Sequence, residues 1–423
     1  MRVETVVQNN LCISCGICAG ICPTQAIESV YSDGMYLPKI NHEQCTNCGL
    51  CYKMCPGKSC DYKELYAIAG QDNPQNIFTG NYEDVFVLQE KNKEWLKKSG
   101  SGGVVSRFVH ELLKDKQYDA AFLVDTHFYG TEIFTHCYES LDDNGQTAKS
   151  RYVTVNQREA IRYIRENRKK KVILVGTSCF IQGFWRVMKQ LHLQKDNYFL
   201  IGLFCDKTMN YRVWEYFQYL TGNKKMTELR FRDKEAGDWP GNMMLFMSDA
   251  EKRTLPRGRR MEVKEYFCPE RCLYCIDKLN QFADISVGDN YTGEHSDIAG
   301  TSSVIVRSQT GKAILEKYAD KFHIWESSIE VVQKSQVLDL RRYNYFWSLN
   351  KSEQVGYPVN ILPEGCVPSE NGLTNIQQRY NILRKKQEIG KLGKFRAMRR
   401  QIFKQKIRRK FGAILRRILK KSL

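Results

Sequence analysis

Residues 11–23 read LCISCGICAGICP, and residues 44–56 read QCTNCGLCYKMCP. In both stretches two, two and three residues separate successive cysteines, and a proline follows the last one. In this pattern the first three cysteines hold one cubane cluster of iron and sulfide, and the fourth reaches across to the neighbouring cluster. The spacing therefore predicts two [4Fe-4S] clusters near the start of the chain.

Because the fourth cysteine of each motif binds the cluster of the other motif, the pattern assigns four ligands to each cluster. One cluster takes Cys12, Cys15, Cys18 and Cys55, and the other takes Cys45, Cys48, Cys51 and Cys22. Gly16 and Gly49 follow the second cysteine of each motif, where the chain has to turn tightly. A pair of zinc sites is the alternative, but zinc needs four ligands for each ion and does not need the exchange. Cys60 lies outside the pattern and is interpreted as an ordinary thiol.

The composition describes a folded protein with a basic tail. A chain of 423 residues that is 42% hydrophobic can bury a substantial core, which excludes a disordered protein. We expect a cytoplasmic protein, because no apolar run reaches about 18 residues and the first residues lack a secretion signal. In that compartment 16 cysteines indicate metal or redox chemistry rather than disulfides. Of the net charge of +18, residues 391–423 carry +14.

From Val85 onward, short apolar runs alternate with amphipathic helical stretches. The runs at 119–125, 152–155, 171–176 and 197–206 predict strands. This alternation is typical of an α/β body with a largely parallel or mixed sheet. The segment in front of it resembles a bacterial two-cluster ferredoxin, which implies an α+β ferredoxin-like domain.

These patterns divide the chain into six segments. They are a two-cluster domain (1–62), a connector (63–82), two lobes of the body (83–170 and 171–345), a helical linker (346–390) and a basic amphipathic tail (391–423).

A glycine-rich loop opens the first long helical pattern of the body. It consists of Lys98, Ser99, Gly100, Ser101, Gly102 and Gly103. Backbone N–H groups at the start of that helix could hold a phosphate or the edge of a flavin, supported by the charge of Lys98. A flexible linker is the alternative interpretation of such a loop.

Four further cysteines occupy suggestive positions in the body. Cys179 and Cys205 each follow a predicted strand, and the carboxyl ends of parallel strands are where α/β proteins place their sites. Cys272 and Cys275 form a C-x2-C pair just before the predicted strand at 283–289. Buried, inert cysteines are the alternative, since free cysteine often serves as a small apolar residue.

Five stretches of the body, taken in order, resemble one family. They are SGSGGVVS (99–106), GTSCFIQG (176–183), GLFCDKTMN (202–210), FRDKEAGDW (231–239) and CLYCIDKLNQFADISVGDNYTG (272–293). They resemble the beta subunit of hydrogenases and formate dehydrogenases that depend on the deazaflavin coenzyme F420. With the cysteine motifs in front, the resemblance covers about residues 10 to 345. The chain is closest in character to homologues from bacterial polysaccharide gene clusters.

The resemblance implies a flavoprotein in which FAD lies between iron–sulfur clusters and a substrate. It also implies a third [4Fe-4S] cluster close to the flavin, whose ligands would be Cys179, Cys205, Cys272 and Cys275. Cys268 is an additional cysteine beside this group and could replace one of the four. Ser178 and Phe180 stand where relatives usually have proline and glutamine, which leaves the geometry around Cys179 open.

Two functions are compatible with the resemblance. One is an oxidoreductase acting on a small substrate, such as a sugar or nucleotide-sugar intermediate of surface polysaccharide biosynthesis. The other is an electron-transfer subunit without its own substrate. Both need an electron donor or acceptor, either a protein or a reduced carrier. Polar residues near the inferred site, each of which also suits a surface or structural role, are Lys98, Asp206, Asp238, Asp289 and His295. No residue is assigned as catalytic.

The tail, residues 391–423, combines basic and apolar residues at helical spacing. The apolar residues, three or four apart, are Leu392, Phe395, Met398, Ile402, Phe403, Ile407, Phe411, Ile414, Leu415, Ile418 and Leu419. Such a helix suits the surface of an anionic membrane, so we expect a peripheral protein on the cytoplasmic face. Packing on the body is one alternative. A nucleic-acid contact is not expected, because it depends on charge rather than on an apolar stripe.

Overall fold

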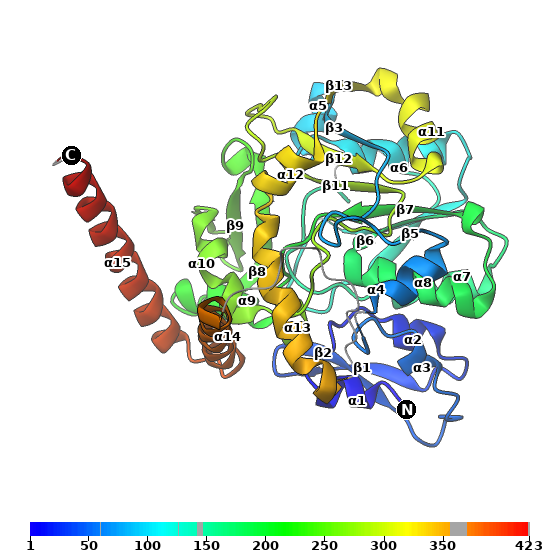
Figure 1. Ribbon diagram of the computed structural model, residues 1–423, viewed down its shortest axis with the longest axis horizontal. Helices are drawn as coiled ribbons and strands as arrows, with labels where there is room; N and C mark the ends of the chain where they lie inside the picture. Colours follow the sequence, from blue (N-terminus) through cyan, green and yellow to red (C-terminus); the bar gives the residue numbers. More distant parts are fainter. Residues whose placement is uncertain (60, 126, 142–146, 356–369, 422–423) are drawn as a thin grey trace.

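Figure 1 shows the computed structural model, which describes the chain except for residues 60, 126, 142–146, 356–369 and 422–423. The two cysteine motifs lie in an N-terminal part that is built from short helices and one hairpin. Its elements are α1 (Glu4–Gln8), α2 (Ile17–Ile21), β1 (Ile27–Ser32), β2 (Met35–Ile40) and α3 (Leu50–Lys53). The strands β1 and β2 pair antiparallel, with Ile27 opposite Ile40. The ferredoxin-like fold of this part stays a prediction.

The two cysteine motifs take the same local form. Gly16 precedes α2 with φ +76°, and Gly49 precedes α3 with φ +73°. Glycine adopts this left-handed conformation without the strain that a Cβ causes. At Gly16 space is also lacking, because a Cβ there would lie 1.8 Å from Oδ1 of Asn156. Each motif therefore turns at its glycine and then begins the helix that carries its third cysteine.

The predicted connector contains a helix that is partly buried. This helix, α4 (Tyr62–Ala69), begins at Asp61, whose side chain accepts a hydrogen bond from the N–H of Glu64 at 2.9 Å. Tyr62, Leu65 and Tyr66 are buried. The first part of the connector therefore contributes to the core.

The body is organised around an eight-stranded mixed sheet with the order β13-β3-β12-β11-β7-β6-β4-β5. Its strands are β3 (Asp84–Glu90), β4 (Ala120–Val124), β5 (Thr135–Tyr138), β6 (Val172–Thr177), β7 (Tyr198–Leu203), β11 (Ile285–Asp289), β12 (Ser302–Val306) and β13 (Phe322–Glu326). The neighbours β11, β7, β6 and β4 run parallel to one another. The segments 83–170 and 171–345, which were predicted as separate lobes, share this one sheet.

Alternation along the strands separates two cores, one on each face of the sheet. Leu174 and Leu200 belong to the core that includes α7 (Arg158–Glu166) and α8 (Ser178–Leu191). The buried residues of the N-terminal part, such as Ile17, belong to this same core. On the other face, Ile173 and Phe199 share a core with side chains of α6 (Val104–Lys114) and α11 (Gln309–Lys317). The N-terminal part is thus joined to the body through α7 and α8.

One predicted strand is absent from the described structure. Residues 152–155 make a single isolated bridge, between Val153 and Met209, and do not form a strand. The N–H of Asn156, just beyond this segment, donates to the carbonyl of Ile133 at 2.8 Å. An apolar run of four residues is too short to distinguish a strand from extended loop.

A second, three-stranded sheet forms a smaller unit. It consists of β8 (Met226–Asp233), β9 (Asn242–Met247) and β10 (Lys252–Leu255) in the order β10-β9-β8. Its core also takes side chains from α9 (Arg212–Leu220) and α10 (Gly258–Phe267). This unit lies beside the carboxyl ends of β6 and β7 in Figure 1.

The C-terminal segments are helical. They form α13 (Arg341–Val355), α14 (Glu370–Lys391) and α15 (Phe395–Lys421), and α15 projects away from the body in Figure 1. The tail begins against the body, because Met398 and Ile402 are buried in the core of the small unit. Phe403 and Phe411 are 64% and 68% exposed. The apolar residues of the tail therefore divide between the body and the exposed surface.

None of the helices in the described ranges has the length and apolar character that spanning a membrane requires. The side chains of the last apolar residues of the tail, from Ile414 on, lie outside the described part.

Candidate functional site

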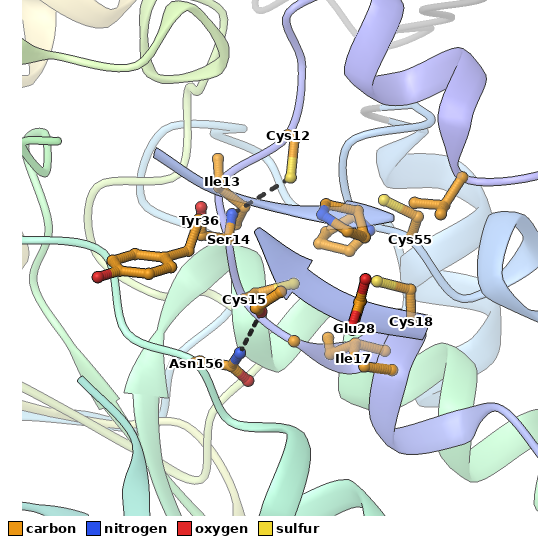
Figure 2. A pocket seen from close by; sticks show the side chains of 16 residues that line it. Cys12, Ile13, Ser14, Cys15, Ile17, Cys18, Glu28, Tyr36, Cys55 and Asn156 are labelled. Carbon is orange, nitrogen blue, oxygen red and sulfur yellow. Dashed lines mark hydrogen bonds between the residues drawn. The ribbon is translucent and has the colours of Figure 1, made fainter. Parts of the chain in front are cut away.

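Four cysteines from both motifs surround one pocket. Figure 2 shows Cys12, Cys15, Cys18 and Cys55 around it, so the fourth cysteine of the second motif joins the first three of the first. Most of the remaining lining is apolar and comes from residues such as Val3, Ile13, Ile17, Pro38 and Pro56. This is the grouping that the sequence predicted from the exchange of the fourth cysteine.

The surroundings of these sulfurs fit a positively charged inorganic core. Burial raises the pKa of Cys12 to about 12, and the nearby Cys55 adds to that rise. Burial also raises the pKa values of Cys15 and Cys18, and the charge of Cys55 adds to both. The N–H of Ser14 donates to Sγ of Cys12 at 3.4 Å. Four thiolates can lie together in such a buried pocket only when a bound cationic group compensates their charge, and a [4Fe-4S] core would supply that compensation.

Zinc and a cubane cluster need different spacings of the same ligands. Tetrahedral zinc holds each thiolate sulfur at about 2.3 Å, so its ligands converge on one point. A cubane cluster has an iron at each of four corners, so its ligands stand further apart.

The second group of cysteines lies nearer the surface. Burial raises the pKa of Cys51, and the charges of Cys48 and Cys45 add to the rise, which shows that these three lie together. Cys48 is exposed. Cys22 is buried directly after α2, and its sulfur lies 3.6 Å from Oγ1 of Thr24. The place of Cys22 in this group stays a prediction.

A third group of cysteines forms at the carboxyl ends of two parallel strands. β6 and β7 end side by side, with Thr177 opposite Leu203. Cys179 lies in the first turn of α8, just after β6, and Cys205 follows β7 by two residues. Cys272 lies in the short helix η3 (Glu270–Leu273), and Cys275 follows it.

The four cysteines of the third group lie close enough to affect one another's pKa values. Burial raises the pKa of Cys205 well above its usual value, and the charges of Cys272, Cys179 and Cys275 add to the rise. Burial also raises the pKa of Cys179 to about 11, with Cys272 again adding to it. The structure thus assembles Cys179, Cys205, Cys272 and Cys275 from three separate stretches of chain.

Cys268 lies directly against this third group. Its side chain is hydrogen-bonded to Cys272, and this contact is the main cause that lowers the pKa of Cys272 to about 7. Burial raises the pKa of Cys268 itself. Cys268 is therefore placed where it could exchange with Cys272 as a ligand.

Two residues of α13 fix the loops that carry the third group. Arg341 Nη1 donates to the carbonyl of Cys275 at 3.0 Å, and its Nη2 donates to the carbonyl of Cys205 at 3.3 Å. Asn344 Nδ2 donates to the carbonyls of Cys275 and Cys272 at 2.7 and 3.3 Å. Sequence reasoning missed both residues, because they lie about 70 residues beyond the C-x2-C pair and belong to no motif.

The glycine-rich loop joins α5 (Lys93–Lys98) to α6. Gly103 caps the start of α6 with φ +79°, and no side chain caps that helix end. A Cβ on Gly102 would lie 2.6 Å from the carbonyl oxygen of Leu88 and 2.7 Å from the nitrogen of Ser302. The strands β3 and β12 therefore already demand glycine at position 102.

Buried cations lie beside this loop. Arg232 Nη2 donates to the carbonyl of Gly100 at 2.7 Å, and Lys234 Nζ donates to the carbonyl of Ser101 at 3.0 Å. Burial lowers the pKa of Lys234 to about 8, and the charge of Arg232 contributes. Arg260 lies over the ring of Tyr152 at 3.6 Å.

Within the described chain, Nη1 of Arg260 is buried without a hydrogen-bond partner. We call Arg232, Lys234 and Arg260, together with Lys149, the cation cluster. Lys149 is close to the loop, because a Cβ on Gly100 would lie 3.1 Å from the Cα of Lys149. Two of the four residues fall in the stretch FRDKEAGDW, which the sequence singled out by resemblance but without a role.

The other polar candidates take part in ion pairs or lie at the surface. Asp206 pairs with Lys264 at 2.7 Å and with Arg341 at 3.0 Å, and Asp289 pairs with Arg232 at 2.8 Å. Asp238 and His295 are exposed. These contacts assign structural roles to Asp206 and Asp289.

Comparison with known proteins gives two family matches. Residues 11–59 match the 4Fe-4S dicluster domain, and residues 169–331 match the C terminus of the beta subunit of coenzyme F420 hydrogenase/dehydrogenase. Residues 169–331 belong to that beta-subunit family. The family segment includes all four cysteines of the third group, and the dicluster segment includes all eight cysteines of the two motifs. The N-terminal part is accordingly a domain for two [4Fe-4S] clusters.

One solved structure is similar to part of this chain. The chain is 18% identical to a chain of the F420-reducing [NiFe] hydrogenase complex from Methanosarcina barkeri, with a TM-score of 0.49. The alignment covers 66% of this chain and 94% of that one. No curated protein matches the sequence.

Proposed function

We propose that this protein is an iron–sulfur flavoprotein oxidoreductase that passes electrons between three [4Fe-4S] clusters and FAD. The observation that carries the proposal is the grouping of the cysteines: four around the pocket of the dicluster domain, three more near its surface that Cys22 is predicted to complete, and four at the carboxyl ends of β6 and β7. Bound FAD would exchange single electrons with the clusters on one side and a hydride with a substrate on the other.

The ligand sets follow the cysteine groups. The first cluster takes Cys12, Cys15, Cys18 and Cys55; the second takes Cys45, Cys48, Cys51 and Cys22; the third takes Cys179, Cys205, Cys272 and Cys275. In the third set, Arg341 and Asn344 donate hydrogen bonds to three of the cysteine carbonyls and so fix the loops that carry these cysteines. Such support from outside the ligand set orients ligands and tunes a metal centre.

FAD is assigned to the glycine-rich loop and the cation cluster. The start of α6 lacks a side-chain cap, so its N–H groups suit a phosphate. Arg232 and Lys234 lie against the carbonyls of the same loop and supply positive charge for a diphosphate. The unpartnered Nη1 of Arg260 is a further donor. Lys98, Ser99, Gly100, Ser101, Gly102 and Gly103 form the loop itself.

An electron-transfer subunit without its own substrate is the second candidate. The exposed Cys48 favours it, because a cluster near the surface can exchange electrons with a partner protein or reduced carrier. The family match concerns one subunit of a hydrogenase or dehydrogenase, which also suits this role. An isolated chain that reduces dyes but turns over no small substrate would support this candidate. For the first candidate, an intermediate of surface polysaccharide biosynthesis is the proposed substrate class.

The tail places the protein at a membrane surface in this proposal. The exposed side chains of Phe403, Ile407 and Phe411 lie on a helix that is rich in Lys and Arg. Apolar burial and attraction to anionic headgroups would act together there. The proposed location is the cytoplasmic face of the membrane.

Replacing Lys234 by Met tests the flavin site. We expect the variant to bind FAD about 10- to 100-fold more weakly, because a charge-assisted hydrogen bond contributes about 1.5–3 kcal/mol. In the unaltered protein, flavin affinity should fall as the pH rises through about 8, where Lys234 loses its charge. The variant should lack this pH dependence. Flavin fluorescence titration of the chain purified without oxygen measures both.

The matched control is Lys252→Met, which removes an exposed lysine on β10 of the three-stranded sheet; Lys234 directly follows β8 of that sheet. It should leave flavin affinity unchanged, and both variants should keep their iron. Equal flavin affinity in the Lys234→Met variant and the unaltered chain would place the flavin elsewhere.

A further inference from the structure

We infer that electrons cross between the dicluster domain and the body at one contact, where Arg271 is a cation shared by the first and third cysteine groups. This inference rests on the proposed function, because it needs a cluster at each of these two groups. In that role Arg271 is a positioning residue that sets the reduction potentials of both clusters. It is not a ligand of either.

The first and third groups meet through α8. Cys179 lies in the first turn of this helix, and Gly183 lies four residues further, which is about 6 Å along the axis. A Cβ on Gly183 would lie 2.4 Å from Cδ1 of Ile17 and 3.2 Å from Cδ of Pro56. Ile17 and Pro56 are the chain neighbours of Cys18 and Cys55, so α8 packs directly on the first group.

Arg271 lies at this contact. It is 1% exposed and directly precedes Cys272 in η3. Its Nη2 donates to the carbonyl oxygen of Pro56 at 3.4 Å, and Pro56 lines the pocket of the first group. One guanidinium thus joins the stretch that carries Cys272 to the stretch that carries Cys55.

A buried cation favours the reduced form of a neighbouring cluster. With clusters bound at both groups, one electron would pass between them at this contact, so that one cluster would be oxidised as the other is reduced, and no bond or proton would move. Reduction adds one negative charge, which a nearby guanidinium stabilises strongly where water is excluded. Because Arg271 is close to both groups, it raises both potentials together and keeps the transfer between them nearly balanced.

Replacing Arg271 by Gln tests this role, since glutamine can still donate to Pro56 but carries no charge. In the full chain purified without oxygen, the reduction potentials of the first and third clusters should each become more negative by about 59 mV. For a one-electron step this shift is about a tenfold change in the equilibrium constant of reduction. The third potential, assigned to the exposed second group, should not move. Redox titration followed by electron paramagnetic resonance measures all three.

Two variants serve as controls. Arg271→Lys keeps the charge and should restore both potentials. Arg186→Met removes the other buried cation beside Cys55, which pairs with Glu64 at 3.2 Å. It should move the potential of the first cluster alone.

Unchanged potentials in an Arg271→Gln variant that keeps all its iron would overturn the inference. If that variant loses iron, the unaltered chain is measured instead. Its first and third clusters should show magnetic coupling when both are reduced. This coupling should disappear in a Cys272→Ser/Cys275→Ser variant. Absence of the coupling would also overturn the inference. By contrast, only about eight irons in the unaltered chain would overturn the proposed function itself.

Discussion

The Cys272→Ser/Cys275→Ser double variant should lose about four of about twelve iron atoms and keep the other eight or so in the dicluster domain. A [4Fe-4S] cluster needs its thiolates, and serine supplies a poor substitute for two of four. The dicluster domain should be unaffected, because its two ligand sets lie within residues 11–59. Iron and sulfide analysis together with electron paramagnetic resonance measures the loss.

Cys137→Ser is the matched control for this variant. Cys137 is an exposed cysteine on β5 that belongs to none of the three groups, so its replacement should leave the iron content unchanged. If the double variant keeps all its iron, Cys272 and Cys275 are structural thiols. If only one of the two serine changes matters, Cys268 has taken the place of the other, as its contact with Cys272 allows.

Changing Phe403, Ile407 and Phe411 to Glu should abolish binding to anionic vesicles. The three side chains are exposed on α15, so their replacement should leave the core of the small unit intact. The change removes the apolar contact and lowers the positive charge of the tail, in which each basic residue contributes about 1 kcal/mol to binding. Flotation with vesicles that contain phosphatidylserine measures the binding. The unaltered chain should float with these vesicles.

A control with the same added charge separates the loss of apolar contact from a general effect of added negative charge. Met261, Ile298 and Ile382 are exposed outside the tail, and changing them to Glu adds the same three negative charges. That variant should still float. A truncated chain without the tail is less informative, because Met398 and Ile402 belong to the core. Equal flotation of the tail variant and the unaltered chain would mean that the tail does not bind membranes.

Local patterns in the sequence were sufficient for several strands of the body and for the cysteines of the first and third groups. The predicted strands at 119–125, 171–176 and 197–206 correspond to β4, β6 and β7. Because parallel strands end at one edge of a sheet, the positions of Cys179 and Cys205 after β6 and β7 already implied a shared site. The motif spacing likewise implied that Cys55 joins the first group.

Residues that act through packing could not be found in this way. Arg271, Arg341 and Asn344 touch the cysteine loops only because distant segments fold together, and none of them belongs to a recurrent spacing. For the same reason, nothing in the sequence shows that Met398 enters the core while Phe403 stays exposed, although both fit one amphipathic pattern. Amphipathicity identifies a face but not what covers it.

The most direct test of the account is the cofactor content of the full chain purified without oxygen. We expect about twelve irons, about twelve acid-labile sulfides and about one FAD for each chain, since each of three clusters contributes four irons and four sulfides. About eight irons without flavin would mean that only the dicluster domain binds cofactors. That result would contradict the proposed third cluster and flavin site. Stoichiometric zinc without sulfide would contradict all of the proposed [4Fe-4S] clusters.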